Sequence, residues 1–210
     1  LALGFSEVRS LPSDARDPGR AHRVSPVVPL LAALNDPVPE VVSNALLGLG
    51  LQAYRDMPTA RIVDLLATSP QSTLRINASW ALKKLADAGA PLEGVGPVVQ
   101  RALADEEPAV RAQAALIVAR LEDAEAIPAL SLLLRDEKNL PAAAAVRALS
   151  FMASRNDDLK GTCVRALTAA MGEVRPEIRA AIMSNLTNLS GRNYGERADE
   201  EWKRWAESLR

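Results

Sequence analysis

A pattern of apolar residues that returns about every 34 residues is the feature that most constrains this chain. Each copy has an apolar residue at a first position and again four and eight residues later, positions that stack on one side of an α-helix. We therefore expect five helices, each burying this stripe. The first positions are Val41, Leu74, Val110, Leu140 and Ile178, at intervals of 33, 36, 30 and 38 residues.

Another apolar segment with helical spacing precedes each of these five helices. A short turn separates the two, and Pro39, Pro108 and Pro176 stand near the starts of their helices, where a missing N–H costs nothing. The unit is therefore helix, short turn, helix, repeated five times. The preceding segments are residues 26–34, 60–68, 95–104, 127–134 and 159–171.

The composition agrees with helices packed over small side chains. Hydrophobic residues make up 48% of the chain but aromatic residues only 3%, so the core must be aliphatic and rich in alanine. The formal net charge is −1, which gives no support to a nucleic-acid or anionic-membrane surface. No apolar run reaches the roughly 18 residues that span a bilayer, so we expect no membrane insertion in this segment.

Two segments carry a resemblance to a known family. Residues 105–115 read DEEPAVRAQAA and residues 173–181 read EVRPEIRAA. They resemble HEAT-type repeats, of the short kind also described as similar to phycobilisome-lyase repeats, and the resemblance extends over about residues 25–190. It implies an all-α, right-handed solenoid of about five two-helix repeats, in which the second helices line the concave side.

That family often places an acidic residue in the turn and an arginine six residues later. Asp105 with Arg111 and Glu173 with Arg179 match this pattern. Three copies depart from this pattern. The copy at Ser69 keeps the arginine, Arg75, but lacks the turn acid. The copies at Asp36 and Asp136 keep the turn acid but lack the arginine. We expect these charges to tie neighbouring repeats together and to be structural.

The two ends differ from the repeats. Residues 1–24 are interpreted as the remnant of a preceding repeat plus a polar loop, so we expect the solenoid to continue upstream. Residues 25–190 form the repeat solenoid, and residues 191–210 resemble a Trp-rich tail of many bacterial HEAT-repeat proteins. Trp202 and Trp205 share one helical face and are expected to close the last repeat. An aromatic recognition patch is the alternative.

Catalytic chemistry has little support in the sequence. His22 is the only histidine and Cys163 the only cysteine, so a Ser/His/Asp site and a tetrahedral zinc site both lack members. Cys163 lies at an apolar helix position and is interpreted as a core residue. Gly48 and Gly50 lie at a helix end instead of after a strand, so they do not indicate a dinucleotide site. We expect no enzyme, cofactor or metal.

The second helices offer a surface beside the buried stripe. If they line the concave side, amides and scattered cations form a groove, and the amides can both donate to and accept from an extended peptide backbone. The alternative is that these are solvated residues without a partner. The candidate partner-binding residues are Asn44, Asn77, Lys84, Gln113, Arg120, Arg147 and Asn188.

These observations favour a non-catalytic scaffold that binds a protein or peptide and no nucleic acid. Short HEAT-like repeats also occur in bilin-attaching lyases and DNA-alkylation glycosylases, so an accessory or lyase-type protein acting on a chromophore or a protein complex is one alternative. The glycosylase would need a basic groove with aromatic contacts. A structural spacer of a larger envelope protein is the other alternative. The sequence leaves compartment and oligomeric state open.

Overall fold

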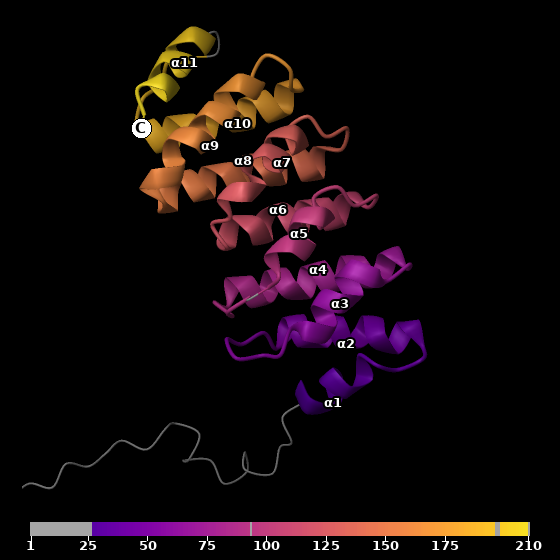
Figure 1. Cartoon of the computed structure of the whole chain (residues 1–210). Coiled ribbons are helices and arrows are strands. Elements are labelled where there is room, and N and C mark those ends of the chain that lie inside the picture. The colour runs from indigo at the N-terminus through magenta and orange to yellow at the C-terminus, as the bar shows by residue number, and fades with distance from the viewer. Residues whose placement is uncertain (1–26, 93, 196–197, 210) are drawn as a thin grey trace, which may run out of the picture.

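The computed structural model describes residues 27–92, 94–195 and 198–209, and every regular element in those ranges is a helix (Figure 1). The predicted remnant and loop at residues 1–24 lie outside the described residues. The first helices of the pairs are α1 (Val27–Ala33), α3 (Ala60–Thr68), α5 (Gly96–Ala102), α7 (Ile127–Leu133) and α9 (Asp157–Ala170). The second helices are α2 (Pro39–Leu51), α4 (Ser72–Asp87), α6 (Pro108–Arg120), α8 (Asn139–Arg155) and α10 (Pro176–Ser190).

A short 3₁₀ turn, η2 (Ala124–Ala126), precedes α7, and α11 (Asp199–Glu207) follows the last pair. Consecutive second helices pack on one another from α2 to α10, and the pairs stack into a right-handed solenoid (Figure 1). The predicted all-α solenoid of five two-helix repeats is confirmed. None of the described helices is both long and apolar enough to span a bilayer.

A repeated turn sets the start of the second helices. The Oδ1 atoms of Asp36, Asp105 and Asp136 each accept a hydrogen bond of 2.8 Å from the backbone N–H two residues later, at the residue that precedes the helix. Such a carboxylate satisfies a backbone donor that the helix itself leaves unpaired. Proline at the first helical position of α2, α6 and α10 then fixes the backbone for the helix.

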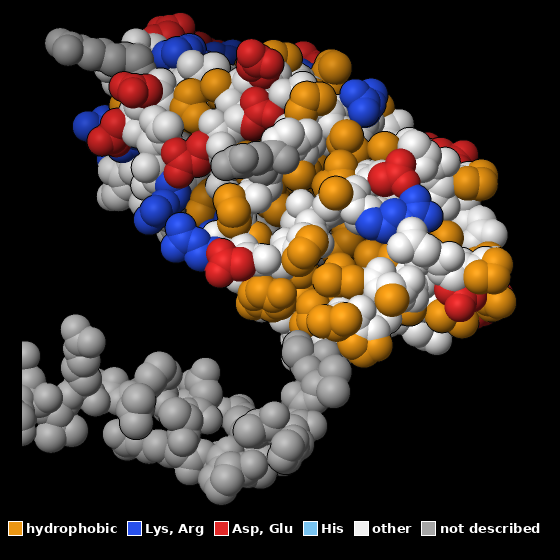
Figure 2. Space-filling model, turned by 60° about the horizontal axis from the view of Figure 1, so that its bottom comes forward, with side chains coloured by type: hydrophobic (Ala, Val, Ile, Leu, Met, Phe, Trp, Pro, Cys, Tyr) orange, Lys and Arg blue, Asp and Glu red, His pale blue; other side chains and the backbone are white. Residues whose placement is uncertain are grey.

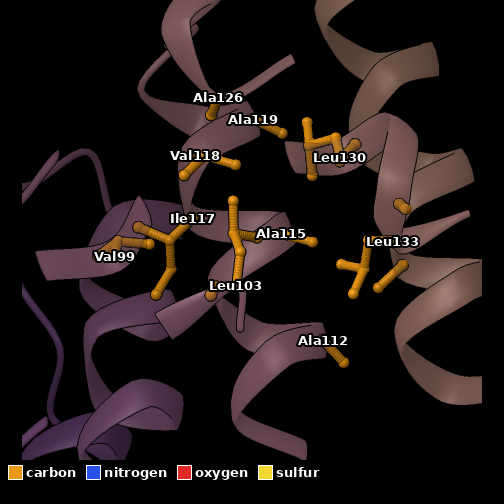
Figure 3. Packing of buried hydrophobic residues seen from close by; sticks show 14 of the residues in the cluster. Val99, Leu103, Ala112, Ala115, Ile117, Val118, Ala119, Ala126, Leu130 and Leu133 are labelled. Atoms are coloured by element: carbon orange, nitrogen blue, oxygen red, sulfur yellow. The ribbon is translucent and has the colours of Figure 1, made fainter. Parts of the chain in front are cut away.

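The core is aliphatic and lies between the two layers of helices (Figure 3). Ile117 and Val118 of α6 are fully buried, and Val99 of α5 and Leu130 of α7 are equally so. Alanine is frequent on α6 and α8, so adjacent second helices pack closely. Small side chains at the contact shorten the distance between helix axes.

Two positions of the predicted stripe are not in the core. Leu140 is 59% exposed and Val41 is 37% exposed, whereas Val110 is fully buried. Leu140 is the second residue of α8 and Val110 is the third of α6, so Leu140 is turned by about 100° toward solvent. Pro141 occupies the third position of α8 and is buried. Val41 belongs to α2, the outermost described second helix.

The two ends of the solenoid are unlike. At one end α11 packs on α9 and buries Trp202, and the ring of Trp202 meets those of Tyr194 and Trp205 edge-on, at centroid distances of 4.7 and 5.8 Å. The division into solenoid and C-terminal cap stays a prediction that this packing supports. At the other end, around α1 and α2, large hydrophobic side chains are exposed (Figure 2). They include Val28 and Leu51.

Candidate functional site

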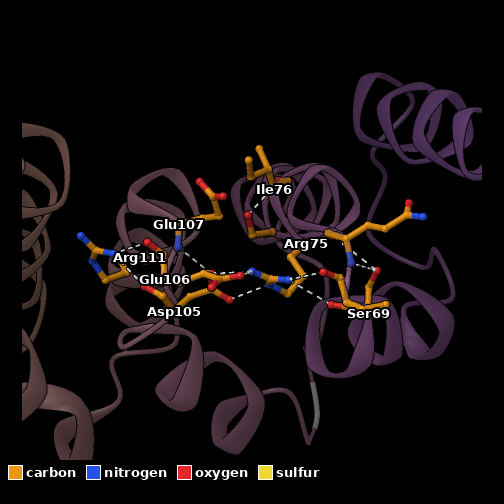
Figure 4. Close-up of polar contacts among 10 residues, drawn as sticks. Ser69, Arg75, Ile76, Asp105, Glu106, Glu107 and Arg111 are labelled. Atoms are coloured by element: carbon orange, nitrogen blue, oxygen red, sulfur yellow. Dashed lines mark hydrogen bonds and ion pairs between the residues drawn. The ribbon is translucent and has the colours of Figure 1, made fainter.

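Arginines at the starts of the second helices join neighbouring repeats (Figure 4). Arg75 of α4 donates from Nε and Nη2 to the carboxylate of Asp105, at 2.8 and 3.2 Å. Its Nη1 donates to the backbone carbonyls of Ser69 and Pro70, which lie in its own turn. The guanidinium therefore links its own turn to the turn of the next repeat.

Arg111 of α6 repeats this arrangement one unit further along. It pairs with Asp136 of the next turn at 2.7 and 3.0 Å, and its Nη1 donates to the carbonyls of Asp105 and Glu106 in its own turn. The expectation that these charges tie repeats together is confirmed. Each arginine pairs with the acid of the following repeat and binds only backbone carbonyls in its own turn.

The repeats of α8 and α10 complete this ladder in other ways. Position 142, where α8 would carry the arginine, is alanine, and Arg175 of the next turn instead donates to the carbonyls of Asp136 and Glu137 at 2.8 and 2.9 Å. Arg179 pairs with Asp199 of α11. The C-terminal helix thus supplies the acid that a following turn would contribute.

Two of the ladder carboxylates, Asp136 and Asp199, are held in their charged form. Burial acts to raise the pKa of Asp136, but hydrogen bonds from Arg111 and from the Lys138 backbone, with the nearby positive charges, outweigh it and leave the pKa below its ordinary value. The hydrogen bond from Arg179 lowers the pKa of Asp199. Neither carboxyl is arranged to exchange a proton near neutral pH, so both are structural.

A second polar region lies across the middle of α4, α6 and α8. Two adjoining hollows there share Lys83, Leu116 and Arg147 in their walls. We name the pair of hollows the central groove. Its other walls include alanines of α6 and α8, and its larger or charged members are Trp80, Lys83, Lys84, Asp87, Gln113, Leu116, Arg120, Leu140, Arg147 and Phe151.

Four of the seven predicted site residues meet in the central groove: Lys84, Gln113, Arg120 and Arg147. The other three do not line it. Asn77 donates to the Ser43 hydroxyl at 2.6 Å and so links α4 to α2. Asn44 lines a separate hollow between α2 and α4, and Asn188 is exposed on α10.

Aromatic rings hold two of the groove's cations. The Nζ of Lys84 lies 5.6 Å from the centre of the Trp80 ring, and the Cζ of Arg120 lies 4.5 Å from that of Phe151. Trp80 has room because residue 50 is glycine: a Cβ there would overlap the indole.

One acid and two incompletely engaged side chains complete the groove. Asp87 pairs with Lys83 and with Arg120, at 2.5 and 3.1 Å. Burial would raise the pKa of Asp87, but these two cations outweigh it and lower the pKa. Arg147 is exposed and has no ion pair among the described residues. The Oε1 of Gln113 is buried and accepts no hydrogen bond from them.

Sequence reasoning missed several members of the groove. Lys83, Leu116 and Phe151 were not among the candidates, and Leu140 was assigned to the core. Trp80 could have been recognised as a candidate from the sequence, because it is the only tryptophan outside the C-terminal segment. A register counted from the turn acid at Asp136 would also have moved Leu140 out of the stripe.

The described residues offer no group of three or more side chains suited to hold a metal. Cys163 is buried in α9, and burial raises the pKa of its thiol to about 12. A thiol with such a pKa is protonated at neutral pH and therefore a poor nucleophile.

Comparison with solved structures establishes the class of this fold. An engineered protein is 19% identical and superposes with a TM-score of 0.63 over 89% of this chain and 88% of its own. A designed armadillo repeat protein in complex with the peptide (KR)4 is 18% identical, with a TM-score of 0.62 over 88% and 89% of the two chains.

A third solved structure belongs to computationally designed armadillo repeat proteins for modular peptide recognition. It is 20% identical, with a TM-score of 0.56 over 76% of this chain and 80% of its own. No protein-family model and no curated protein matches the chain. The chain is therefore an α-solenoid of helical repeats similar in fold to designed armadillo proteins, and the narrower HEAT-type assignment stays a prediction.

Proposed function

We propose that this solenoid is a non-catalytic scaffold that binds an extended peptide segment of a partner protein in the central groove. One observation carries the proposal: three side chains in the walls of one groove are left open by the described residues. They are a buried amide acceptor and an exposed arginine that find no hydrogen bond or ion pair among those residues, and a 59% exposed leucine. These are Gln113, Arg147 and Leu140.

Two of these three side chains, Gln113 and Leu140, gain from any extended peptide. A buried acceptor without a hydrogen bond costs free energy, and a turn of the Gln113 side chain toward the groove would let a peptide N–H recover it. An exposed leucine loses its contact with water when an apolar side chain covers it. A peptide supplies both kinds of group along one extended strand, whereas a small polar molecule would satisfy only the first.

The size of the groove suits a short segment. Neighbouring helix axes are about 8–10 Å apart, so the three helices α4, α6 and α8 present a track of roughly 20 Å. An extended chain advances about 3.3 Å per residue, which corresponds to about six residues in the groove.

The comparisons are consistent with a peptide-binding scaffold. Structural neighbours are designed repeat proteins, and two of them are described as bound to a peptide or made for peptide recognition. Their identity to this chain supports the shared fold alone. The repeated turn acid and the arginine ladder support the narrower proposal that the repeats are of the HEAT type.

Peptide display with the purified chain tests the proposal. Selection from a random peptide library should enrich peptides that bind the wild-type chain. These peptides should bind a Gln113→Leu, Leu140→Ala double variant about tenfold or more weakly, which corresponds to about 1.4 kcal/mol. Both changes leave the charge of the groove untouched. Arg101→Ala, at an exposed residue of α5 outside the groove, is the control and should bind as the wild type does. Enriched peptides that ignore the double variant would contradict the proposal.

A further inference from the structure

The central groove is positively charged although the whole chain is nearly neutral. Its described walls hold four cations, Lys83, Lys84, Arg120 and Arg147, and one acid, Asp87. The formal net charge of the chain is −1. The groove therefore has a net positive charge although positive and negative residues nearly balance in the whole sequence. Such a local excess of positive charge favours a negatively charged ligand.

Two of these cations are not neutralised by the groove itself. Asp87 forms ion pairs with Lys83 and Arg120. Lys84 contacts a ring face and no carboxylate, and Arg147 has no ion pair among the described residues. Both line the larger hollow, whose described walls contain no acid. They stand on α4 and α8, on either side of α6, which carries Gln113.

The positive region ends at the edges of the groove. Helix α2 has no lysine or arginine and carries Glu40, and the one cation of α10, Arg179, is paired with Asp199. The phosphates of a duplex would run past α4 and α8 onto these neutral flanks. The floor of the larger hollow is also apolar, with Leu116 and alanines of α6 and α8. A short segment that mixes acidic and apolar residues fits this arrangement better than nucleic acid does.

We infer that the partner segment of the central groove is acidic. Its carboxylates pair with Arg147 and Lys84, and an apolar side chain lies on Leu116 and Leu140. A backbone N–H donates to the Oε1 of Gln113 once that side chain turns toward the groove. This inference rests on the proposed function and adds to it the chemistry of the partner. Arginine binds a carboxylate through two parallel hydrogen bonds, which gives Arg147 the greater share of the selectivity.

Fluorescence anisotropy with labelled synthetic peptides tests this inference. The probes are (Asp-Leu)4, (Ser-Leu)4 and (Lys-Leu)4, together with a labelled duplex DNA. We expect (Asp-Leu)4 to bind about tenfold or more tightly than (Ser-Leu)4, and (Lys-Leu)4 to bind most weakly. Added salt should weaken the acidic probe more than the neutral one, because the pairing is electrostatic.

Charge-reversal variants locate the effect. Arg147→Glu and Lys84→Glu should each weaken (Asp-Leu)4 by about tenfold or more and leave (Ser-Leu)4 little changed. Arg101→Glu makes the same change of charge outside the groove, on an exposed residue of α5, and should leave both peptides unaffected. Circular dichroism of each variant verifies that the helical fold is retained.

The outcomes separate this inference from the proposed function. If (Ser-Leu)4 or display-selected neutral peptides bind the groove as tightly as (Asp-Leu)4, the acidic partner is wrong and the peptide scaffold stands. Tighter binding of the duplex DNA than of (Asp-Leu)4, lost in Arg147→Glu, would overturn both and favour a nucleic-acid surface. If neither the probes nor displayed peptides bind the groove, both proposals fall.

Discussion

The second helices carry two sets of arginines that have different surroundings, and α6 carries a member of each. In the ladder, the side chains of Arg75 and Arg111 are 10% and 12% exposed, and each is enclosed by turn carbonyls and a carboxylate of the next repeat. In the central groove, Arg120 is 44% exposed and Arg147 has no ion pair among the described residues. Residue type alone therefore does not distinguish a structural guanidinium from one available to a partner.

The difference comes from how many partners the fold brings to each guanidinium. A ladder arginine sits where two turns meet, so it donates four or five hydrogen bonds, about half of them to backbone carbonyls that its own turn holds in place. A groove arginine lies on a helix face that is exposed to solvent, where an ion pair contributes little to stability because water competes for the charges. Loss of a ladder arginine should therefore lower stability, and loss of a groove arginine should lower affinity.

Acidification should have the largest effect on the ladder, because it titrates the carboxyls of Asp136 and Asp199 together. The pKa values of Asp136 and Asp199 are lowered in the folded chain. Their contribution to stability is then fully present above the unfolded-state pKa of about 3.9 and is lost as the pH falls through the lower folded-state values. Thermal melting followed by circular dichroism should show a steep fall of Tm below about pH 4.

Asp136→Asn is the matched comparison for this titration. It should melt earlier at neutral pH and then lose less stability than the wild type on acidification, since one titrating ladder carboxyl is gone. An acid dependence of Tm identical to that of the wild type would show that Asp136 does not contribute to the ladder as described.

Arg111→Ala should have the largest effect of any single arginine. It leaves the carboxylate of Asp136, which is 8% exposed, without its partner, and breaking such a largely buried pair costs about 3 kcal/mol. Urea unfolding at neutral pH measures the loss. Arg111→Met combined with Asp136→Leu should recover part of it, because the buried charge is removed. A loss under about 1 kcal/mol would place this pair with ordinary exposed ones.

Arg175→Ala should cost less, about 2 kcal/mol, because it removes charged hydrogen bonds to two backbone carbonyls and leaves no buried carboxylate unpaired. Ala142→Arg in the Arg175→Ala chain should restore part of this stability. That position follows Asp136 as Arg111 follows Asp105, and Arg111 reaches the carbonyls of its own turn. If Ala142→Arg leaves the unfolding free energy of the Arg175→Ala chain unchanged, then the contact between an arginine and the turn carbonyls depends on more than this spacing.

Arg147→Ala should have the smallest effect on folding, within about 0.5 kcal/mol, because the side chain is exposed and unpaired among the described residues. The same variant should weaken the acidic probe clearly. Unfolding free energy and anisotropy measured on one preparation give both numbers. A stability loss like that of Arg111→Ala would erase the distinction between ladder and groove.

Much of the fold could be predicted from the sequence because each signal was local. The turn acid, the first-turn proline and the apolar spacing all act within one helix pair, and they place α3 at residues 60–68 as the structure has it. The site was less predictable. The groove brings together residues of three helices because α4, α6 and α8 stack; these residues are Lys84, Gln113, Arg120 and Arg147. The spacing along one helix does not show which of its residues are engaged by a neighbouring helix. Asn77 is an example, because it forms a hydrogen bond with Ser43 of α2.

The sequence by itself determined the repeat, the paired helices and the residues that stabilise the turns, since these follow from helix periodicity and from hydrogen bonds between near neighbours in the chain. The tertiary structure decided which acid each arginine pairs with. It also gathered cations from three helices into one groove. Those features depend on distances between residues some 30 positions apart, which the stacking of whole helices sets and which no local pattern encodes.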